Sequence, residues 1–224
     1  MSTNDGALAV TGLSVGFDTR DGHINMIDDV SLALRRGKTL ALVGESGCGK
    51  SLLTLALMGL VDRPGRVTGG ELEFGEHRYG LPEQTSIATL RGARAAMVFQ
   101  EPMSALNPVL TVGAQIQESL LLHTGLRDEE AKARALSWLA RVGLPDPERA
   151  HEAYPHQLSG GMKQRVMIAM ALAGEPEVLL ADEPTTALDA TVQGQILKLL
   201  RDLQREQQLA MLLVTHDLGL VLTL

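Results

Sequence analysis

Residues 39–51 read TLALVGESGCGKS, a largely apolar run that leads into a glycine-rich loop and a lysine–serine pair. The unbroken run predicts a strand buried on both faces, because a half-exposed strand alternates apolar and polar residues. The apolar residues 52–60 beyond the loop predict a helix. A glycine-rich loop of this spacing between a strand and a helix indicates a phosphate-binding loop rather than a glycine-rich turn without a ligand.

The residues of this loop have separate predicted tasks. Gly44, Gly47 and Gly49 allow a tight backbone whose N–H groups point at a polyphosphate, at the positive end of the next helix. Lys50 is expected to reach the β- and γ-phosphates, and the Ser51 hydroxyl to bind Mg²⁺. The predicted nucleotide contacts of this segment are Gly44, Glu45, Ser46, Gly47, Cys48, Gly49, Lys50, Ser51 and Leu52.

Cys48 is the single cysteine of the chain. Its simplest role is that of a small side chain that fits the loop, and the alternative is a reactive thiol at a helix N-terminus beside Lys50, which a maleimide would modify and Mg-ATP would protect. One cysteine excludes internal disulfides. Together with the polar N-terminus MSTNDGALAV, which does not resemble an export signal, it favours a reducing cytosolic compartment.

The composition limits the classes of function. With 224 residues, of which 45% are hydrophobic, the chain can bury a core as one domain or as one domain with a subdomain. The net charge of −7 and the lack of a basic run argue against a nucleic-acid partner. The longest apolar stretch, residues 52–61, is well short of the roughly 20 residues that span a bilayer. Any role at a membrane would therefore require a partner.

Strand patterns give way to helix patterns in the middle of the chain. Residues 13–17 and 30–34 alternate apolar with polar side chains and predict two strands. Residues 112–120 have a helical period, and residues 128–142 begin with acids and end with arginine, as a helix does. These helices predict an inserted helical subdomain. A polar, proline-bearing stretch, residues 145–155, leads out of it.

Helix and strand alternate again in the last third of the chain. Residues 162–172 and 192–203 predict helices, and the apolar residues 178–181 and 210–214 predict buried strands. Strands that alternate with crossover helices indicate a mostly parallel sheet. The predicted fold class is therefore α/β.

Candidate catalytic side chains follow the last two of these strands. Asp182 ends the strand at residues 178–181, where a carboxylate can meet Mg²⁺ held on the neighbouring loop. Glu183, one residue further, can position or deprotonate water, and a helix N-cap is the alternative for this acidic pair. His216 follows the strand at residues 210–214, and we expect it at the same rim of the sheet rather than as a stray surface histidine.

A third motif, LSGGMKQR at residues 158–165, lies between the phosphate loop and the acidic strand end. With it, the chain resembles the nucleotide-binding subunit of an ATP-binding cassette (ABC) transporter. The motifs that carry this resemblance occur in the family's order: Walker A GESGCGKS (44–51), the Q-loop residue Gln100 in VFQEP, the signature LSGGM (158–162), Walker B VLLADE (178–183), the D-loop Ala187-Leu188-Asp189 and the switch histidine His216.

The resemblance implies a domain organisation and assigns residues to the nucleotide sites of two facing subunits. It implies a single domain, residues 1–224, in which a RecA-like P-loop NTPase core with antiparallel N-terminal strands (1–100 and 166–224) carries a helical subdomain (101–165). Ser159, Gly160 and Gly161 would contact the γ-phosphate of ATP bound to a facing subunit, with Asp189 at the same interface. Phe17 would stack on adenine, although a plain core phenylalanine is an equal alternative.

The implied activity is ATP hydrolysis with Mg²⁺. Ser51, Asp182 and Gln100 would surround the metal ion, and Lys50, Gln100, Glu183 and His216 would act in catalysis. The stretches QEPMSALNP and YPHQLSGGMKQR resemble the importer branch for oligopeptides, dipeptides and nickel. The implied partners are a second ATPase subunit, identical or not, transmembrane permeases and an external solute-binding protein. The subunit would be peripheral at the cytoplasmic face of the membrane.

The sequence lacks the features typical of two other classes of phosphate-loop protein. A soluble, non-transport ABC ATPase acting on DNA or ribosomes typically has a coiled coil, two cassettes in one chain, or zinc or basic inserts, and none is visible. A phosphate-loop kinase or GTPase would lack LSGGM, and the base-recognition motif NKxD of GTPases is not found. Family members continue past the switch histidine with further strands and a helix, whereas this chain ends at Leu224, so we expect either that its C-terminal end is truncated or that something else completes its sheet.

Overall fold

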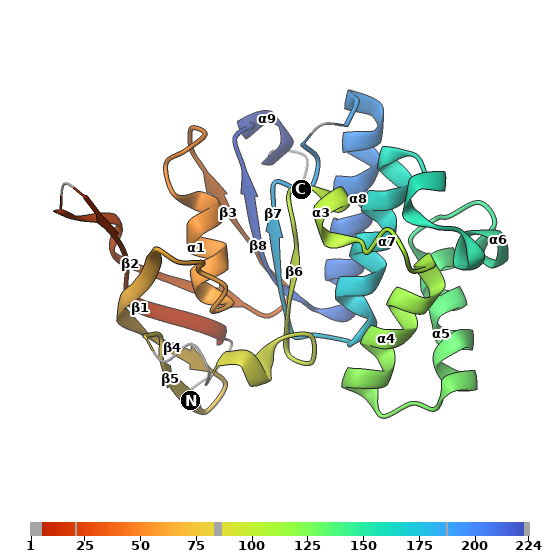
Figure 1. Ribbon diagram of the computed structural model, residues 1–224, viewed down its shortest axis with the longest axis horizontal. Coiled ribbons are helices and arrows are strands. Elements are labelled where there is room, and N and C mark those ends of the chain that lie inside the picture. Colours follow the sequence, from red (N-terminus) through yellow and green to blue (C-terminus); the bar gives the residue numbers. More distant parts are fainter. Residues whose placement is uncertain (1–5, 21, 83–86, 187, 222–224) are drawn as a thin grey trace.

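The computed structural model describes residues 6–20, 22–82, 87–186 and 188–221. Within these ranges, two four-stranded sheets carry helices mainly on one side (Figure 1), one antiparallel in the order β2-β1-β4-β5 and one parallel in the order β3-β8-β7-β6. The strands are β1 (Gly6–Thr19), β2 (Gly22–Arg35), β3 (Thr39–Val43), β4 (Gly65–Phe74), β5 (His77–Gly80), β6 (Ala95–Val98), β7 (Val178–Asp182) and β8 (Ala210–Thr215). The predicted α/β class, with antiparallel N-terminal strands and a parallel sheet, is confirmed.

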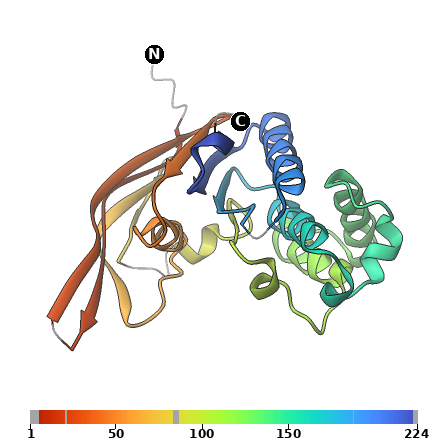
Figure 2. The same cartoon turned by 90° about the horizontal axis from the view of Figure 1, so that it is seen from above.

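The helices fall into two groups around the parallel sheet. Figure 2 shows α1 beside the antiparallel sheet and the other long helices on the opposite side of the parallel strands. The helices are α1 (Lys50–Leu57), α3 (Pro102–Ala105), α4 (Val112–Thr124), α5 (Asp128–Arg141), α6 (Pro147–Glu152), α7 (Gly160–Ala173), α8 (Ala190–Gln207) and α9 (Leu218–Val221), with 3₁₀ turns η1 (Ala88–Leu90) and η2 (Pro155–Gln157). No helix in the described ranges has the length and apolar character needed to cross a bilayer.

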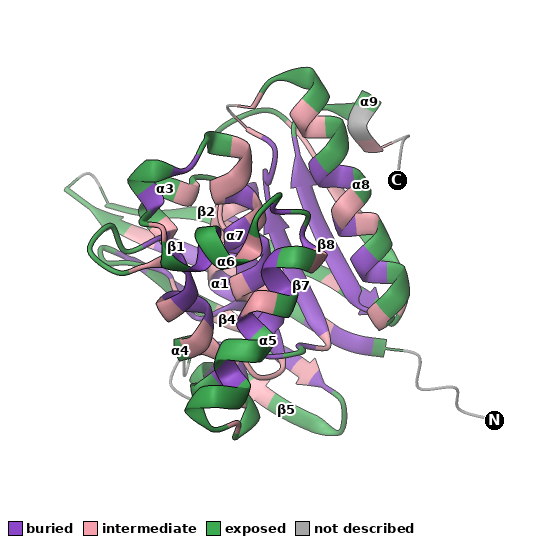
Figure 3. Cartoon of the chain, turned by 90° about the vertical axis from the view of Figure 1, so that its right-hand side faces the viewer, coloured by how far each residue is buried: buried purple, intermediate pink, exposed green. Residues whose placement is uncertain are grey.

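The parallel strands separate two hydrophobic cores, because successive side chains of a strand point to opposite faces. In β7, Val178 and Leu180 belong to the core shared with α1 and the antiparallel sheet, which we call the first core. Leu179 and Ala181 belong to the core shared with α4, α5, α7 and α8, which we call the second core. Figure 3 shows β7 and β8 buried along their length between these two layers.

The strand that precedes the phosphate loop is less buried than its sequence predicts. Thr39 and Leu40 are exposed, Leu40 to 38%, and the rest of β3 is half-buried. The prediction of a strand buried on both faces is therefore wrong. The physical reason is position: among the described residues β3 pairs with β8 alone, so it lies at the edge of the sheet.

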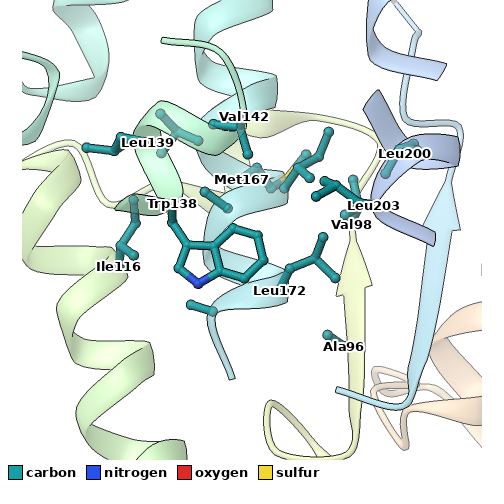
Figure 4. Packing of buried hydrophobic residues seen from close by; sticks show 14 of the residues in the cluster. Ala96, Val98, Ile116, Trp138, Leu139, Val142, Met167, Leu172, Leu200 and Leu203 are labelled. Carbon is teal, nitrogen blue, oxygen red and sulfur yellow. The ribbon is translucent and has the colours of Figure 1, made fainter. Parts of the chain in front are cut away.

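The second core is centred on a tryptophan. Trp138 of α5 is 1% exposed and packs among Ile116 of α4 and Met167 and Leu172 of α7 (Figure 4). These helices include the predicted ones at residues 112–120 and 128–142. The division of the chain into a core and a helical subdomain with the stated boundaries stays a prediction.

The proline-bearing stretch at residues 145–155 contains a short helix, α6, that the sequence reading did not identify. Asp146 caps it, since its carboxylate accepts a hydrogen bond from the Arg149 N–H at 3.1 Å. Pro147 occupies the first helical position, where its missing N–H costs nothing. The strands β4, β5 and β6 were also not predicted individually.

An ionic cluster closes the amino end of the parallel sheet. The Glu177 carboxylate, just before β7, accepts a hydrogen bond from Arg94 Nε at 2.8 Å and another from Arg36. Burial alone would raise the pKa of Glu177, but the hydrogen bonds and charges of the two arginines hold this pKa below its ordinary value. The Arg94 guanidinium also lies over the Phe74 ring, 4.3 Å from its centroid. The cluster thereby links both sheets.

Candidate functional site

The glycine-rich loop joins β3 to α1 at the carboxyl end of the parallel sheet. Gly47 and Gly49 have φ values of 83° and 97°, which side chains rarely adopt. Gly49 is the N-cap of α1, and no side chain caps this helix. The first N–H groups of α1 are therefore available to an anion, as the sequence predicted for a phosphate loop.

Lys50 directs its ammonium group back into this loop. Lys50 is 6% exposed, and Nζ donates hydrogen bonds to the carbonyl oxygens of Gly44 at 2.8 Å and Glu45 at 2.7 Å. Its Nζ also lies 3.9 Å from Sγ of Cys48, whose side chain is exposed. Of the other predicted contacts, Ser46 is exposed and Leu52 is half-buried.

A hydroxyl and a carboxylate meet beside the loop. Ser51 Oγ donates to Asp182 Oδ1 at 3.0 Å, and Asp182 is 4% exposed. Burial raises the pKa of Asp182, with a smaller rise from the Glu183 charge, while the Ser51 hydrogen bond and the Lys50 charge oppose the rise. Two hard oxygen donors suit Mg²⁺, which keeps several waters and phosphate oxygens in its shell. This donor set fits the predicted metal ion, although no cluster of three His, Cys, Asp or Glu side chains occurs in the described residues.

Three strand ends converge on Glu183. Its Oε2 lies 3.1 Å from His216 Nδ1, which follows β8, and 3.4 Å from Gln100 Nε2, which follows β6. The Glu183 side chain is 9% exposed, whereas that of His216 is 54% exposed. The structure thus brings together Glu183 and His216, which the sequence analysis placed at this rim, and adds Gln100, which the resemblance implied in catalysis without placing it here.

The backbone of Glu183 is itself unusual. Its φ of 43° lies in the left-handed region, which is uncommon for residues other than glycine. The conformation is held by a hydrogen bond from its N–H to the Val214 carbonyl at 3.0 Å and by Thr186, whose hydroxyl donates to Oε2 at 2.8 Å. Thr186 was missed by the sequence analysis. A hydroxyl three residues after an acid was the available signal.

A cavity of about 230 Å³ adjoins the loop on its β2 side. It was not predicted, because its lining residues come from separate segments of the chain: β2, β3, the loop and α1. They include Met26 and Ile27 of β2, together with Cys48, Gly49 and Lys50. Met26 is 48% exposed, so an apolar surface continues from this cavity to solvent.

The signature residues Ser159, Gly160 and Gly161 lie at the start of α7, on the other side of the parallel sheet from α1. The Ser159 hydroxyl caps α7 by accepting from the Met162 N–H at 3.4 Å, and Gly160 and Gly161 are the first two helical residues. α7 packs in the second core and α1 in the first, so the parallel sheet lies between them. The chain does not bring its own signature to its own phosphate loop.

Two further predicted residues have defined surroundings. Asp189 caps α8, its Oδ1 accepting from the Val192 N–H at 3.0 Å; its D-loop neighbour Ala187 lies outside the described residues. Phe17 is half-buried and packs against the first core. A Cβ added to Gly65 would lie 2.7 Å from its ring. These contacts suit a core phenylalanine, and the stacking role of Phe17 stays a prediction.

Comparisons with known proteins indicate the family and the fold of the chain. A family model described as ABC transporter matches residues 27–186. A putative peptide import ATP-binding protein of Brucella abortus is 51% identical over 96% of this chain and 64% of its own length. The dipeptide transport ATP-binding protein DppD of Escherichia coli is 48% identical over 96% of this chain and 65% of its own. The chain thus spans about 64% of the length of such relatives.

A solved structure has the same fold. It is the dimeric, post-hydrolysis state of the ATP-binding cassette MJ0796 bound to ADP and Pi, which superposes with a TM-score of 0.83. The two proteins are 29% identical, and the superposition covers 96% of this chain and 90% of the other.

Proposed function

The chain belongs to the ABC transporter family, and from this premise we propose that it binds ATP, hydrolyses it and thereby energises import of peptides or related small solutes. The observation that carries the proposal is the convergence of Lys50, the Ser51–Asp182 pair and Glu183 at the carboxyl end of one parallel sheet. Relatives named for import of peptides and dipeptides support the class of solute.

The phosphates of ATP are proposed to bind at the loop. There they would accept hydrogen bonds from the uncapped N–H groups at the start of α1. Lys50 would exchange the carbonyls of Gly44 and Glu45 for phosphate oxygens. Mg²⁺, held by Ser51 and Asp182 with Gln100 nearby, would neutralise charge on the phosphate oxygens.

Glu183 is proposed to act on the attacking water. The water oxygen attacks the γ-phosphorus in line, the bond to the β,γ-bridging oxygen breaks, and ADP departs with that electron pair. Glu183 Oε2 orients the water and accepts its proton, which then passes to the released phosphate. His216 and Gln100, both within 3.4 Å of this oxygen, would hold the γ-phosphate and the water in place.

The site would be completed by a second subunit. Ser159, Gly160, Gly161 and Asp189 are proposed to face the nucleotide of a partner ATPase subunit, identical or not. Their location across the sheet from the phosphate loop supports this, as does the dimeric state of a structural relative.

The remaining partners are proposed to lie in and beyond the membrane. Residues 101–108, with Met103 exposed to 61%, would contact a cytoplasmic helix of transmembrane permeases, which in turn meet an external solute-binding protein. The subunit would then be peripheral at the cytoplasmic face of the membrane.

Replacement of Lys50 by alanine tests the enzymatic part of this proposal. Mg-ATPase turnover should fall by about a hundredfold or more, because a charge that stabilises the transition state is lost. Lys198→Ala is the matched control, since this lysine on α8 is exposed and its described ion pair is with the exposed Asp202, at 3.2 Å. Equal turnover in Lys50→Ala and the unmodified chain would refute the proposed ATPase.

The class of solute needs a separate measurement. Membrane vesicles that contain the permeases and this subunit should take up a labelled dipeptide when ATP is enclosed. Uptake that continues with Glu183→Gln in place of the unmodified subunit would contradict the proposed energy coupling.

A further inference from the structure

The signature end of α7 rests on α8 at a glycine. A Cβ built on Gly161 would lie 2.8 Å from Cγ1 of Val192, closer than real Cβ atoms approach. Its neighbour Gly160 has more room, because a Cβ there would meet Leu188 Cδ2 at 3.6 Å, an ordinary contact. Only at residue 161, therefore, does the lack of a side chain allow the two helices to approach this closely.

Val192, which Gly161 contacts, is fixed by hydrogen bonds at the start of α8. The Val192 N–H donates to Asp189 Oδ1 at 3.0 Å, so the same carboxylate begins α8 and anchors Val192. The next residue, Gln193, donates from Nε2 to the carbonyls of Leu188 at 3.1 Å and Thr185 at 3.3 Å. The loop that leads from Glu183 into α8 is thus tied to the first turn of this helix.

A second contact repeats the connection one turn along. Arg165 of α7 donates from Nη2 to Gln195 Oε1 of α8 at 3.0 Å and from Nη1 to the Val142 carbonyl at 2.6 Å. Val192 cannot easily turn aside, since a β-branched side chain in a helix has one strongly preferred χ1 rotamer. α7 and α8 are therefore in contact at Gly161–Val192 and at Arg165–Gln195.

We propose that Val192 is the positioning residue of the signature turn, defined as residues 159–161, because its side chain fixes how closely this turn lies to the start of α8. The inference rests on the proposed function in one respect, that the signature turn and Asp189 both face the partner's nucleotide. In this proposal Val192 acts through the backbone, because it sets the distance between the signature turn and the start of α8, the two elements proposed to face the partner's nucleotide.

A rescue experiment tests this role. In Gly161→Ala, α7 and α8 must separate by at least 0.6 Å to turn a 2.8 Å approach into the shortest ordinary contact, 3.4 Å. We expect kcat to fall about tenfold or more and Tm to fall by about 2–4 °C or more. Adding Val192→Ala leaves nothing nearer than 4.0 Å to the new methyl group, so the double variant should recover most of the Tm that Gly161→Ala loses and should have a higher kcat than Gly161→Ala.

The matched control is Gly194→Ala, on the same helix, where nothing lies within 4 Å of the new Cβ. It should leave kcat unchanged and should not lower Tm. Binding of a fluorescent ATP analogue to the dilute monomer should be equal in all variants, because the phosphate loop lies across the sheet. A loss confined to kcat distinguishes positioning from general damage to the fold.

Three possible results would overturn the positioning role of Val192, its contact with residue 161, or the proposed function. Recovery of Tm without recovery of kcat in the double variant would overturn the positioning role, since the methyl group itself would then obstruct the partner's nucleotide. Additive effects on Tm would overturn the contact. If the unmodified chain hydrolyses no ATP, the proposed function fails, and the changes in Tm of the single and double variants then test the contact between residues 161 and 192 by themselves.

Discussion

Replacement of Glu177 by glutamine is expected to lower the free energy of unfolding by about 1–2 kcal/mol at pH 7. The carboxylate accepts charged hydrogen bonds from Arg94 and Arg36, and the amide would keep one acceptor oxygen but lose the charge. The side chains of Glu177, Arg94 and Arg36 are 26%, 34% and 51% exposed, so solvent screening places the cost between those of surface and buried pairs. For a chain of this size, Tm should fall by about 2–8 °C.

The dependence on pH distinguishes this mechanism from a packing defect. Because the folded-state pKa of Glu177 lies below its ordinary value of 4.5, its contribution is complete above pH 4.5 and is lost as pH falls through the lowered pKa. Urea unfolding of both chains from pH 7 downward should show a difference that shrinks below about pH 4.5.

The control for this prediction is Glu73→Gln. Glu73 pairs with Arg78 at 2.7 Å, but their side chains are 45% and 69% exposed, and the cost should stay below about 1 kcal/mol. Two results would refute the reasoning. One is equal stability of Glu177→Gln and the unmodified chain at pH 7, and the other is a difference that persists unchanged at low pH.

Two further predictions concern the nucleotide site. Glu183→Gln should slow turnover about a hundredfold or more, because an amide cannot accept the proton of water, and an ATP-bound dimer should persist in size-exclusion chromatography; unimpaired turnover would contradict the role of Glu183. N-ethylmaleimide should label the exposed Cys48 and abolish ATPase activity, with Mg-ATP slowing the labelling; Cys48→Ser should take up no label, and full activity after complete labelling would exclude a functional consequence of the thiol.

The meeting of Glu183 and His216 could be predicted because it follows from topology, whereas the strand before Gln100 was not predicted and the position of Gln100 beside Glu183 is known only from the structure. Carboxyl ends of parallel strands share one edge of a sheet, so residues that follow apolar runs meet there whatever their separation in sequence. The hydrogen bond from the Glu183 N–H to the Val214 carbonyl could not be predicted, because no local pattern connects these two residues. The hydrogen bond from the Thr186 hydroxyl had a local signal, a hydroxyl three residues after the acid, which the sequence analysis missed.

The errors of sequence reasoning have equally specific causes. The run from Thr39 is apolar enough for a central strand, and only the choice of neighbours makes it an edge strand. Asp146 and Pro147 begin a helix, although a proline in a polar stretch is more readily read as a break. The fit between Gly161 and Val192 is a matter of tenths of an ångström across two helices, below the resolution of any sequence pattern.

The separation of the first and second cores by single strands has a consequence for how the protein can vary. Leu179 and Leu180 are covalent neighbours, yet one faces the helices that present the signature turn and the other faces α1 and its phosphate loop. Leu179 belongs to the same core as Leu200, and Leu180 belongs to the same core as Leu57. A substitution at either position would therefore be compensated by substitutions in its own core. Substitutions at alternate positions of one strand would therefore affect different cores. The side of the protein that carries the signature turn and the side that carries the phosphate loop would tolerate substitutions independently of each other.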